Sequence, residues 1–231
     1  MSDSSVIARR ISSLCCGLWN PHYTKCKLKT DPLYDGVFSE VRESRLPLLD
    51  IGCGLGILAM YLRERGWRNS VSGFDYDPRK IESGRRMIAR GGYDGILLEQ
   101  GDARHSLPDH RGDVTILDIL QFFDDDEQAG LLRSAASRVA PGGKLIIRSG
   151  LREKSARFLT TWLGDLLAKA TLWMKAAPVR YPTAAFFQRV LEEQGLEVEI
   201  RPFWGRTPFN NYLILARRPG FHTASDVPLS G

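Results

Sequence analysis

The chain has 231 residues, of which 43% are hydrophobic and 26% are charged, and its formal net charge is +5. This length and this balance fit one globular domain with a core of ordinary size. No apolar stretch approaches the roughly 18 residues of a membrane-spanning helix, so the sequence predicts none. The mild positive charge favours acidic partners, but no nucleic-acid-binding signature accompanies it, and we expect no nucleic-acid partner.

The chain contains four cysteines: Cys15, Cys16, Cys26 and Cys53. They form no C-x-x-C pair and no Cys/His cluster with the spacing of a zinc site. The pattern is typical of reduced thiols, which predicts a cytoplasmic protein without a metal site.

Two helices are expected before the first strand. Apolar residues recur at helical spacing over residues 4–19, and Pro21 stops that helix. Asp31-Pro32 opens the second helix, and we assign residues 1–45 to an N-terminal helical cap. Because Arg9-Arg10 lies beside apolar positions, the first helix could also contact the surface of the inner membrane.

Residues 46 to 150 alternate between apolar strands and helices. The predicted strands cover residues 46–51, 71–74, 96–98, 114–120 and 144–147, and the predicted helices cover 55–65, 78–90 and 124–139. Such alternation predicts an α/β domain with a parallel sheet that helices cover on both faces.

The last third departs from this alternation. Residues 155–177 predict a long amphipathic helix, and residues 183–194 predict another. Strands at 196–200 and 212–216 follow with only an irregular segment between them, which predicts a hairpin and an antiparallel last strand. The boundaries are 46–218 for the main domain, 155–181 for a helical insertion on the acceptor side and 219–231 for a disordered tail.

A glycine-rich turn joins the first strand to its helix and reads Asp50-Ile51-Gly52-Cys53-Gly54-Leu55-Gly56. Glycines let the backbone turn sharply and approach a ligand closely. Their alternate spacing differs from the G-x-G-x-x-G of dinucleotide sites, and an acid at Asp50 would repel a pyrophosphate. The turn therefore suits a ligand with a cationic ammonium group.

Further acids follow the next strands. Asp75 ends the second strand, where a carboxylate can accept hydrogen bonds from ribose hydroxyls, whereas Asp77 precedes Pro78 and is interpreted as a helix N-cap. Asp102 follows the third strand, where a carboxylate can accept from an adenine amino group. Asp118 lies near the end of the fourth strand, at the edge where ligands of such sheets bind.

In the glycine-rich turn and in the acidic residues that follow the next strands, the chain resembles the class I S-adenosylmethionine-dependent methyltransferases. The matching segments are LLDIGCGLG at 48–56, FDYDP at 74–78, GDA at 101–103, DVTILDILQFF at 113–123 and APGGKLII at 140–147. The resemblance implies a Rossmann-like, doubly wound sheet of seven strands with the last strand antiparallel, and S-adenosylmethionine as the cofactor. The cofactor-binding residues that it implies are Asp50, Gly52, Cys53, Gly54 and Gly56 toward the methionine part, Asp75 with Tyr76 at the ribose, Asp102 and Ala103 at the adenine, and Asp118 and Ile119 at the methionine end.

Two segments of the last third, WMKAAPVRYPT at 173–183 and RPFWGRTPFNNYLIL at 201–215, are similar to methyltransferases of bacterial aryl-polyene pigment pathways. Those pathways build aromatic polyenes on acyl carrier proteins. The resemblance implies methyl transfer to a small apolar or aromatic acceptor, and a carrier-protein-bound aryl-polyene precursor is the specific hypothesis. The excess of Lys and Arg between Lys144 and Tyr181 would attract an acidic carrier protein.

The acceptor side of the site is marked less clearly. The candidates for a general base are Asp118, His105, Tyr181, Tyr23 and His22. The candidates for acceptor contact are Trp162, Trp204 and Asn210. Core packing explains aromatic side chains at helical spacing equally well, and none of these residues lies in a signature that fixes its role.

Three other functions stay open. The acceptor could be a quinone or another lipid-like metabolite, or the chain could be a non-catalytic module that binds the cofactor. A nicotinamide oxidoreductase would share the sheet and Asp75, but Asp50 and the alternate glycines count against it. The sequence sets neither the methylated atom nor the oligomeric state.

Overall fold

A computed structural model describes residues 3–15, 21–153, 157, 180–205 and 210–220 of the chain. Its centre is one seven-stranded sheet with the strand order β3-β2-β1-β4-β5-β7-β6. The strands are β1 (Leu48–Ile51), β2 (Val71–Asp75), β3 (Ile96–Gln100), β4 (Asp113–Leu117), β5 (Lys144–Gly150), β6 (Glu197–Pro202) and β7 (Asn211–Arg217). The order reverses between β1 and β4, which creates the crevice where doubly wound sheets bind their ligands.

Neighbouring strands from β3 to β5 are parallel, whereas β7 runs antiparallel to both β5 and β6. In the register of β1 and β4, Asp50 lies opposite Thr115, so both side chains project from the same face of the sheet. The predicted Rossmann-like, doubly wound fold with an antiparallel last strand is confirmed.

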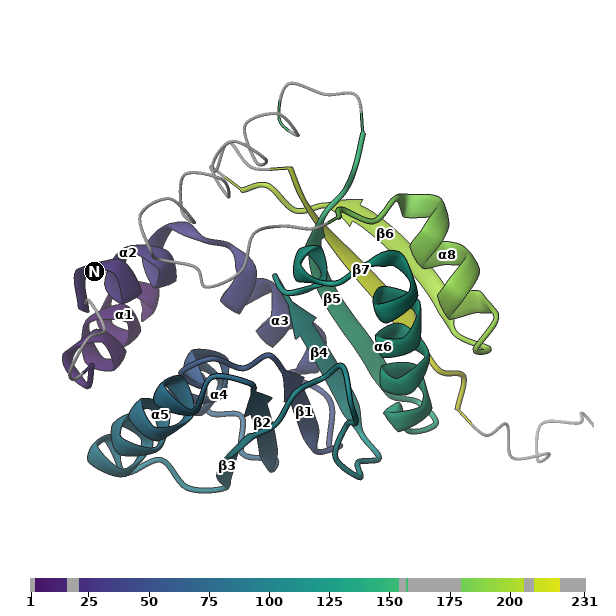
Figure 1. The fold of residues 1–231 in the computed structure, drawn as a ribbon. Helices are drawn as coiled ribbons and strands as arrows, with labels where there is room; N and C mark the ends of the chain where they lie inside the picture. The colour runs from purple at the N-terminus through teal and green to yellow at the C-terminus, as the bar shows by residue number, and fades with distance from the viewer. Residues whose placement is uncertain (1–2, 16–20, 154–156, 158–179, 206–209, 221–231) are drawn as a thin grey trace, which may run out of the picture.

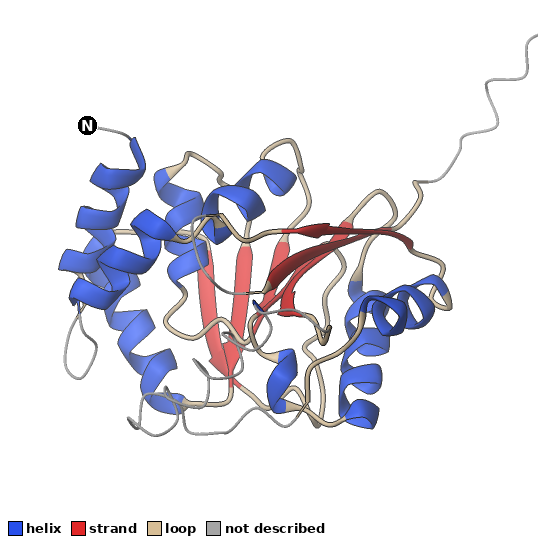
Figure 2. Ribbon diagram, turned by 90° about the horizontal axis from the view of Figure 1, so that it is seen from above, coloured by secondary structure: helices blue, strands red, loops and turns tan. Residues whose placement is uncertain are grey.

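Helices cover both faces of the sheet, as Figure 2 shows from above. One face packs against α3 (Leu33–Val41), α4 (Ile57–Glu64) and α5 (Pro78–Gly91), and the other against α6 (Asp125–Arg138) and α8 (Ala184–Glu192). Successive residues of a strand therefore enter different cores: Leu48 belongs to the first, and Leu49 belongs to the second. Burial on both faces explains why the central strands β1, β4 and β5 contain apolar runs without alternation, whereas the edge strand β6 alternates in sequence and burial.

The N-terminal region contains α1 (Asp3–Ser13) and α2 (Pro21–Thr30) ahead of α3, and Figure 1 shows α1 and α2 together at one end of the molecule, with α3 beside the sheet. The sequence interpretation missed α2 and treated Pro21 only as a stop. Pro21 is the first residue of the helix, a position that proline favours because its φ is already helical and no N–H is needed there. Apolar residues are sparse in PHYTKCKLKT, so helical periodicity gave no signal. The predicted first helix ends at Ser13, and residues 16–20 lie outside the described part.

Helix α3 is tied to the sheet by ion pairs that meet at Glu40. Its carboxylate contacts Lys144 of β5 at 3.2 Å, Arg201 of β6 at 2.8 Å and Arg217 of β7 at 3.9 Å. Only 12% of the Glu40 side chain is exposed, so these contacts are partly shielded from water. The N-terminal helices are thereby joined to the C-terminal strands.

The fourth strand is shorter than predicted. The apolar run suggested a strand to Leu120, but β4 ends at Leu117, and a short 3-10 helix, η1 (Leu120–Phe122), follows the bend at Asp118. Asp118 has a φ of +60°, which breaks the extended backbone. The predicted helix at 155–177 lies outside the described residues except for Arg157, and so does the tail from residue 221 onward.

Candidate functional site

The glycine-rich turn after β1 is built on three left-handed residues. Gly52, Gly54 and Gly56 have φ values of +77°, +56° and +70°, a region that side chains with a Cβ rarely adopt. A Cβ on Gly52 would lie 2.7 Å from the Ile119 side chain, and one on Gly56 would lie 2.9 Å from Leu98. Gly56 is also the N-cap of α4. The turn therefore requires glycine both for its backbone and for its close packing.

Asp50 lies directly beneath this turn and is only 2% exposed. The Thr115 hydroxyl donates to Asp50 Oδ1 at 2.7 Å, as their register positions require. Burial raises the pKa of Asp50 to about 7, against the lowering effect of the Thr115 hydrogen bond and with a smaller raising effect of the Asp75 charge. A cationic group brought next to Asp50 would favour the carboxylate form, so the position suits an ammonium ligand.

Asp75, at the end of β2, holds the turn in place. Its Oδ2 accepts from the Gly54 N–H at 3.0 Å, and its Oδ1 accepts from the Asp77 N–H at 2.9 Å. The neighbouring Tyr76 is 45% exposed and borders the same edge of the sheet. The prediction that Asp77 caps the next helix is confirmed, because its side chain accepts from the Arg79 N–H.

Cys53 packs inside the turn, where its Sγ lies 2.9 Å from the point that a Cβ on Gly73 would occupy. Burial, together with the charges of Asp50 and Asp75, raises the pKa of the Cys53 thiol well above its usual value. The thiol stays protonated at neutral pH, so Cys53 is a packing residue in this site and a poor nucleophile.

The loop after β3 carries Asp102 and Ala103. Asp102 Oδ1 accepts from the Arg104 N–H at 3.0 Å, and the Asp102 side chain stays 34% exposed. The Arg104 guanidinium connects this loop to the β4–α6 connection, because it donates to the Phe122 carbonyl at 3.1 Å and to Glu127 at 3.1 Å. The loop that is expected to frame the adenine is therefore fixed from the opposite side of the crevice.

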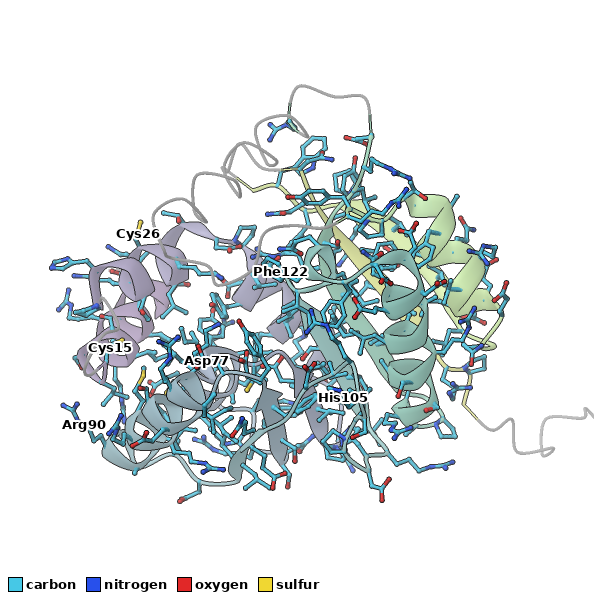
Figure 3. All side chains as sticks on the ribbon, in the orientation of Figure 1. Cys15, Cys26, Asp77, Arg90, His105 and Phe122 are labelled. Carbon is cyan, nitrogen blue, oxygen red and sulfur yellow. The ribbon has the colours of Figure 1, made fainter. Side chains whose placement is uncertain are left out.

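The general-base candidates differ in their surroundings. His105 projects from the loop after β3, visible in Figure 3, with 83% of its side chain exposed, and its closest acid is Asp102 at 3.9 Å. Tyr181 is buried at 6% exposure just before α8. Tyr23 lies in α2, but its side chain belongs to the part of the chain that is not described. His22 is exposed at the start of α2.

Asp118 is engaged by a buried arginine. Arg148 of β5 is 4% exposed; its Nε donates to Asp118 Oδ1 at 2.6 Å, and its Nη2 donates to Asp118 Oδ2. Burial raises the pKa of Asp118, but the charge and hydrogen bonds of Arg148 and the charge of Lys27 lower it by more, so this pKa lies below its usual value. A carboxylate held in this way accepts protons poorly, which argues against Asp118 as a general base.

The predicted acceptor contacts are only partly described. Trp162 lies outside the described residues. The Trp204 ring packs edge-on against Tyr212, with centroids 6.1 Å apart, and the Arg157 guanidinium lies 4.5 Å from the Trp204 centroid. Asn210 is fully buried and donates from Nδ2 to the Leu151 carbonyl at 2.9 Å. These contacts place Asn210 and Trp204 at the junction of β5 and β7.

The sequence did not indicate Arg148 as a site residue and placed it among the basic residues between Lys144 and Tyr181 that would attract an acidic carrier protein. Both Arg148 and Lys144 face the N-terminal helices instead, where they pair with Asp31 and Glu40. Arg148 and Lys144 are therefore not available to attract a carrier protein. No spacing rule links Arg148 to an acid 117 positions away, so only the fold reveals this pair.

Within residues 3–15, 21–153, 157, 180–205 and 210–220, no group of three or more His, Cys, Asp or Glu side chains is arranged to hold a metal ion. In the same part of the chain, no helix has the length and apolar character needed to cross a membrane.

Comparison with known proteins agrees with this geometry. Residues 48–143 match the family model described as a methyltransferase domain. Ribosomal protein L11 methyltransferase of Photobacterium profundum is 35% identical over 128 residues, which cover 52% of this chain and 39% of that protein. Ribosomal RNA small subunit methyltransferase C of Pseudomonas aeruginosa is 33% identical over 100 residues, 42% of this chain and 30% of that protein. The chain thus spans well under half of the length of these relatives.

Solved structures show the same fold over nearly the whole chain. An O-methyltransferase family protein from Burkholderia thailandensis superposes with a TM-score of 0.69 at 18% identity, covering 87% of this chain and 60% of that one. Magnesium protoporphyrin IX methyltransferase from Synechocystis, solved with bound S-adenosylhomocysteine, gives a TM-score of 0.65 at 19% identity and covers 92% and 93% of the two chains. The domain match over residues 48–143 and the shared fold agree with the sequence resemblance to methyltransferases.

Proposed function

We propose that this protein transfers the methyl group of S-adenosylmethionine to a small apolar or aromatic acceptor. One observation carries the proposal: a buried carboxylate, Asp50, lies beneath a turn of three left-handed glycines that Asp75 holds from the next strand. This arrangement offers an anionic contact for an ammonium group and carboxylate oxygens for ribose hydroxyls.

S-adenosylmethionine supplies a methyl group that is already activated on its sulfonium sulfur. The chain then has to hold the reactants in line and exclude water, which can contribute most of the rate enhancement. Asp50 and the glycine turn would fix the amino-acid end, Asp75 the ribose, and Asp102 with Ala103 the adenine. Ile119, packed against Gly52, would limit the space beside the methionine part.

The specific acceptor that we propose is an aryl-polyene precursor on an acyl carrier protein. Its support is the similarity of residues 173–183 and 201–215 to methyltransferases of those pathways, together with exposed basic side chains that line a groove beside Tyr181. This groove of about 340 Å³ lies between the starts of α6 and α8, with Tyr181 and Phe186 in its lining. Its charged lining residues are three arginines, Arg133, Arg152 and Arg189, and two acids, Asp125 and Asp126, so guanidinium groups predominate. An acidic carrier protein would be attracted to such guanidinium groups.

Calorimetric titration with S-adenosylmethionine, S-adenosylhomocysteine and NADH tests the cofactor site. We expect both sulfur compounds to bind, NADH not to bind, and Asp75→Ala to weaken binding by about hundredfold, because it removes the ribose acceptor and releases the turn. Thr183→Ala is the matched control: Thr183 also accepts a backbone N–H, at the start of α8, so its loss lowers stability without touching the cofactor residues. Binding of NADH alone would refute the proposal.

A methyl-transfer assay with free and carrier-bound aromatic acyl chains tests the acceptor. The double variant R152E/R189E is expected to raise the KM for the carrier-bound acceptor about tenfold and to leave that for the free acyl chain unchanged. Arg111→Glu, a charge reversal of an exposed arginine before β4 at the opposite end of the sheet, is the control. Methylation of a quinone or lipid in preference to carrier-bound chains would replace this acceptor, and no methylation with intact cofactor binding would indicate a non-catalytic module.

A further inference from the structure

A buried ionic cluster joins the ends of β4 and β5 to the N-terminal helices. At its centre is Arg148, whose guanidinium donates from Nε and Nη2 to Asp118 and from Nη1 to Asp31. The Arg148 side chain is 4% exposed and the Asp31 side chain 13%. A guanidinium buried to this degree is stable only when carboxylates compensate its charge, and here one arginine engages two.

The contact with Asp118 controls the backbone at the end of β4. Asp118 is the one residue other than glycine in the described part of the chain with a positive φ. Its N–H donates to the Arg148 carbonyl at 3.0 Å, while its own carbonyl accepts from the Gln121 side chain at 3.0 Å. A left-handed bend of this kind costs free energy and persists where surrounding contacts hold it. The next residue, Ile119, then packs on Gly52 of the glycine turn.

The contact with Asp31 controls the junction of α2 and α3. Asp31 Oδ1 accepts from the N–H of Leu33, the first residue of α3, at 3.0 Å, and the Asp31 N–H donates to the Lys27 carbonyl at 2.9 Å. The Lys27 ammonium group lies 4.0 Å from Asp118 Oδ2. The same guanidinium therefore touches the segment that leads to Ile119 and the segment that joins the two helices.

We propose that Arg148 is a positioning residue for cofactor binding: by holding Asp118 and Asp31 together, it fixes the bend that places Ile119 on the glycine turn and keeps the α2–α3 junction beside the methionine end. The inference rests on the proposed function, because it concerns the same cofactor site. It makes the N-terminal helices part of that site, although their residues carry none of its motifs.

A purely structural role would give a different result, and the chain offers a matched comparison. Lys144 lies four residues before Arg148 on the same face of β5 and also pairs with a carboxylate of the N-terminal helices, that of Glu40 in α3. Both pairs tie the N-terminal helices to β5, but only Arg148 also contacts the end of β4. If only the link between the N-terminal helices and β5 mattered, Lys144→Met and Arg148→Met would lower the affinity for the cofactor to the same degree.

The experiment is calorimetric titration of the full chain with S-adenosylhomocysteine, with thermal melting and near-ultraviolet circular dichroism as controls for folding. We expect Arg148→Met to weaken binding by about tenfold or more and Lys144→Met by less than about twofold. Arg148→Lys should be intermediate, because a single ammonium group cannot bridge two carboxylates in the way a guanidinium does. Equal affinities of the Arg148→Met and Lys144→Met variants would overturn the proposal.

The double variant R148M/D118N distinguishes two causes of a lower affinity in Arg148→Met: loss of the positioning by Arg148, and the charge of Asp118 that is left without a counter-ion. In Arg148→Met, the Asp118 carboxylate has lost the guanidinium that compensates its charge. Asp118→Asn removes that charge, so the melting temperature of the double variant should recover toward that of the wild type. Asp118→Asn alone, measured beside it, gives the loss that comes from Asp118 itself, and the affinity of the double variant for S-adenosylhomocysteine should stay below that of Asp118→Asn. An affinity of the double variant equal to that of Asp118→Asn would show that the charge alone caused the loss and would overturn the positioning role. Failure of the wild-type protein to bind would instead contradict the proposed function.

Discussion

The two halves of the sheet form their parts of the site by different means. In the β1–β3 half, the contacts join residues close in the sequence: Gly54 and Asp75 are 21 positions apart, and Asp75 and Asp77 are two apart. In the β4–β7 half, Arg148 pairs with Asp31 at a separation of 117, and Arg201 pairs with Glu40 at 161. Short sequence motifs therefore describe the β1–β3 half, which is the cofactor half. The β4–β7 half, which is the acceptor half, depends on contacts between segments that are distant in the sequence.

The largest expected effect lies in the cofactor half. Gly52→Ala would place a Cβ 2.7 Å from Ile119 at a φ of +77°, so we expect about hundredfold weaker binding of S-adenosylhomocysteine in calorimetry and about 2 kcal/mol lower stability. Gly142→Ala is the control, because its φ is +76° and no atom lies within 4 Å of the added Cβ. That variant should lose about 1 kcal/mol of stability and bind normally. Equal binding by both variants would contradict the close contact with Ile119.

The next effect concerns stability in the acceptor half. Gln128 is 1% exposed, and its Nε2 donates to the carbonyls of Leu120, Phe123 and Arg180 at 3.0 Å each. Gln128→Leu should lower the free energy of unfolding by about 2 kcal/mol, because the three buried carbonyls lose a shared donor.

Urea denaturation measures this change, and Gln188→Leu on the exposed face of α8 serves as its control. Affinity for S-adenosylhomocysteine should fall far less than in Gly52→Ala, since Gln128 holds residue 180 and the β4–α6 connection rather than the glycine turn. A similar loss of affinity in both variants would show that the two halves are coupled more tightly than their contacts indicate.

The smallest effect is a pH dependence at Asp50. Its pKa is about 7 in the ligand-free protein, so most of the carboxyl is protonated at pH 5.5, and affinity for the ammonium group of S-adenosylhomocysteine should rise about tenfold from pH 5.5 to 7.5. Asp50→Asn should remove this dependence and bind more weakly at pH 7.5. A pH dependence that survives in the Asn variant would assign the titration to another group.

The same residue affects the stability of the ligand-free protein in the opposite sense. Because the folded pKa of Asp50 exceeds the value of about 3.9 in an unfolded chain, its stabilising contribution is complete at low pH and is lost as pH rises through about 7. Asp50→Asn should therefore raise the melting temperature at pH 8 by more than it does at pH 4. Urea midpoints at the two pH values provide an independent check.

The sequence predicted the sheet, its antiparallel last strand and the positions of the motif residues, because these depend on local periodicity and on glycine and proline chemistry. It placed the end of the fourth strand at Leu120 since the apolar run continues past Asp118. The bend at Asp118 depends on Arg148, whose role appears only when β5 lies beside β4. It missed α2 for a related reason: that helix is polar along its length, and its place is set by packing with α1 and by Asp31.

The place of β7 in the sheet has a consequence for synthesis on the ribosome. Strand β7 is the last in the chain, yet it separates β5 from β6. A nascent chain therefore completes β5 and must extend by roughly sixty residues before β7, which pairs with the other edge of β5, emerges. Until then the edge of β5 has unpaired backbone groups, which are a template for aggregation. Translation between Gly150 and Asn211 is therefore the interval in which this edge is open to other strands.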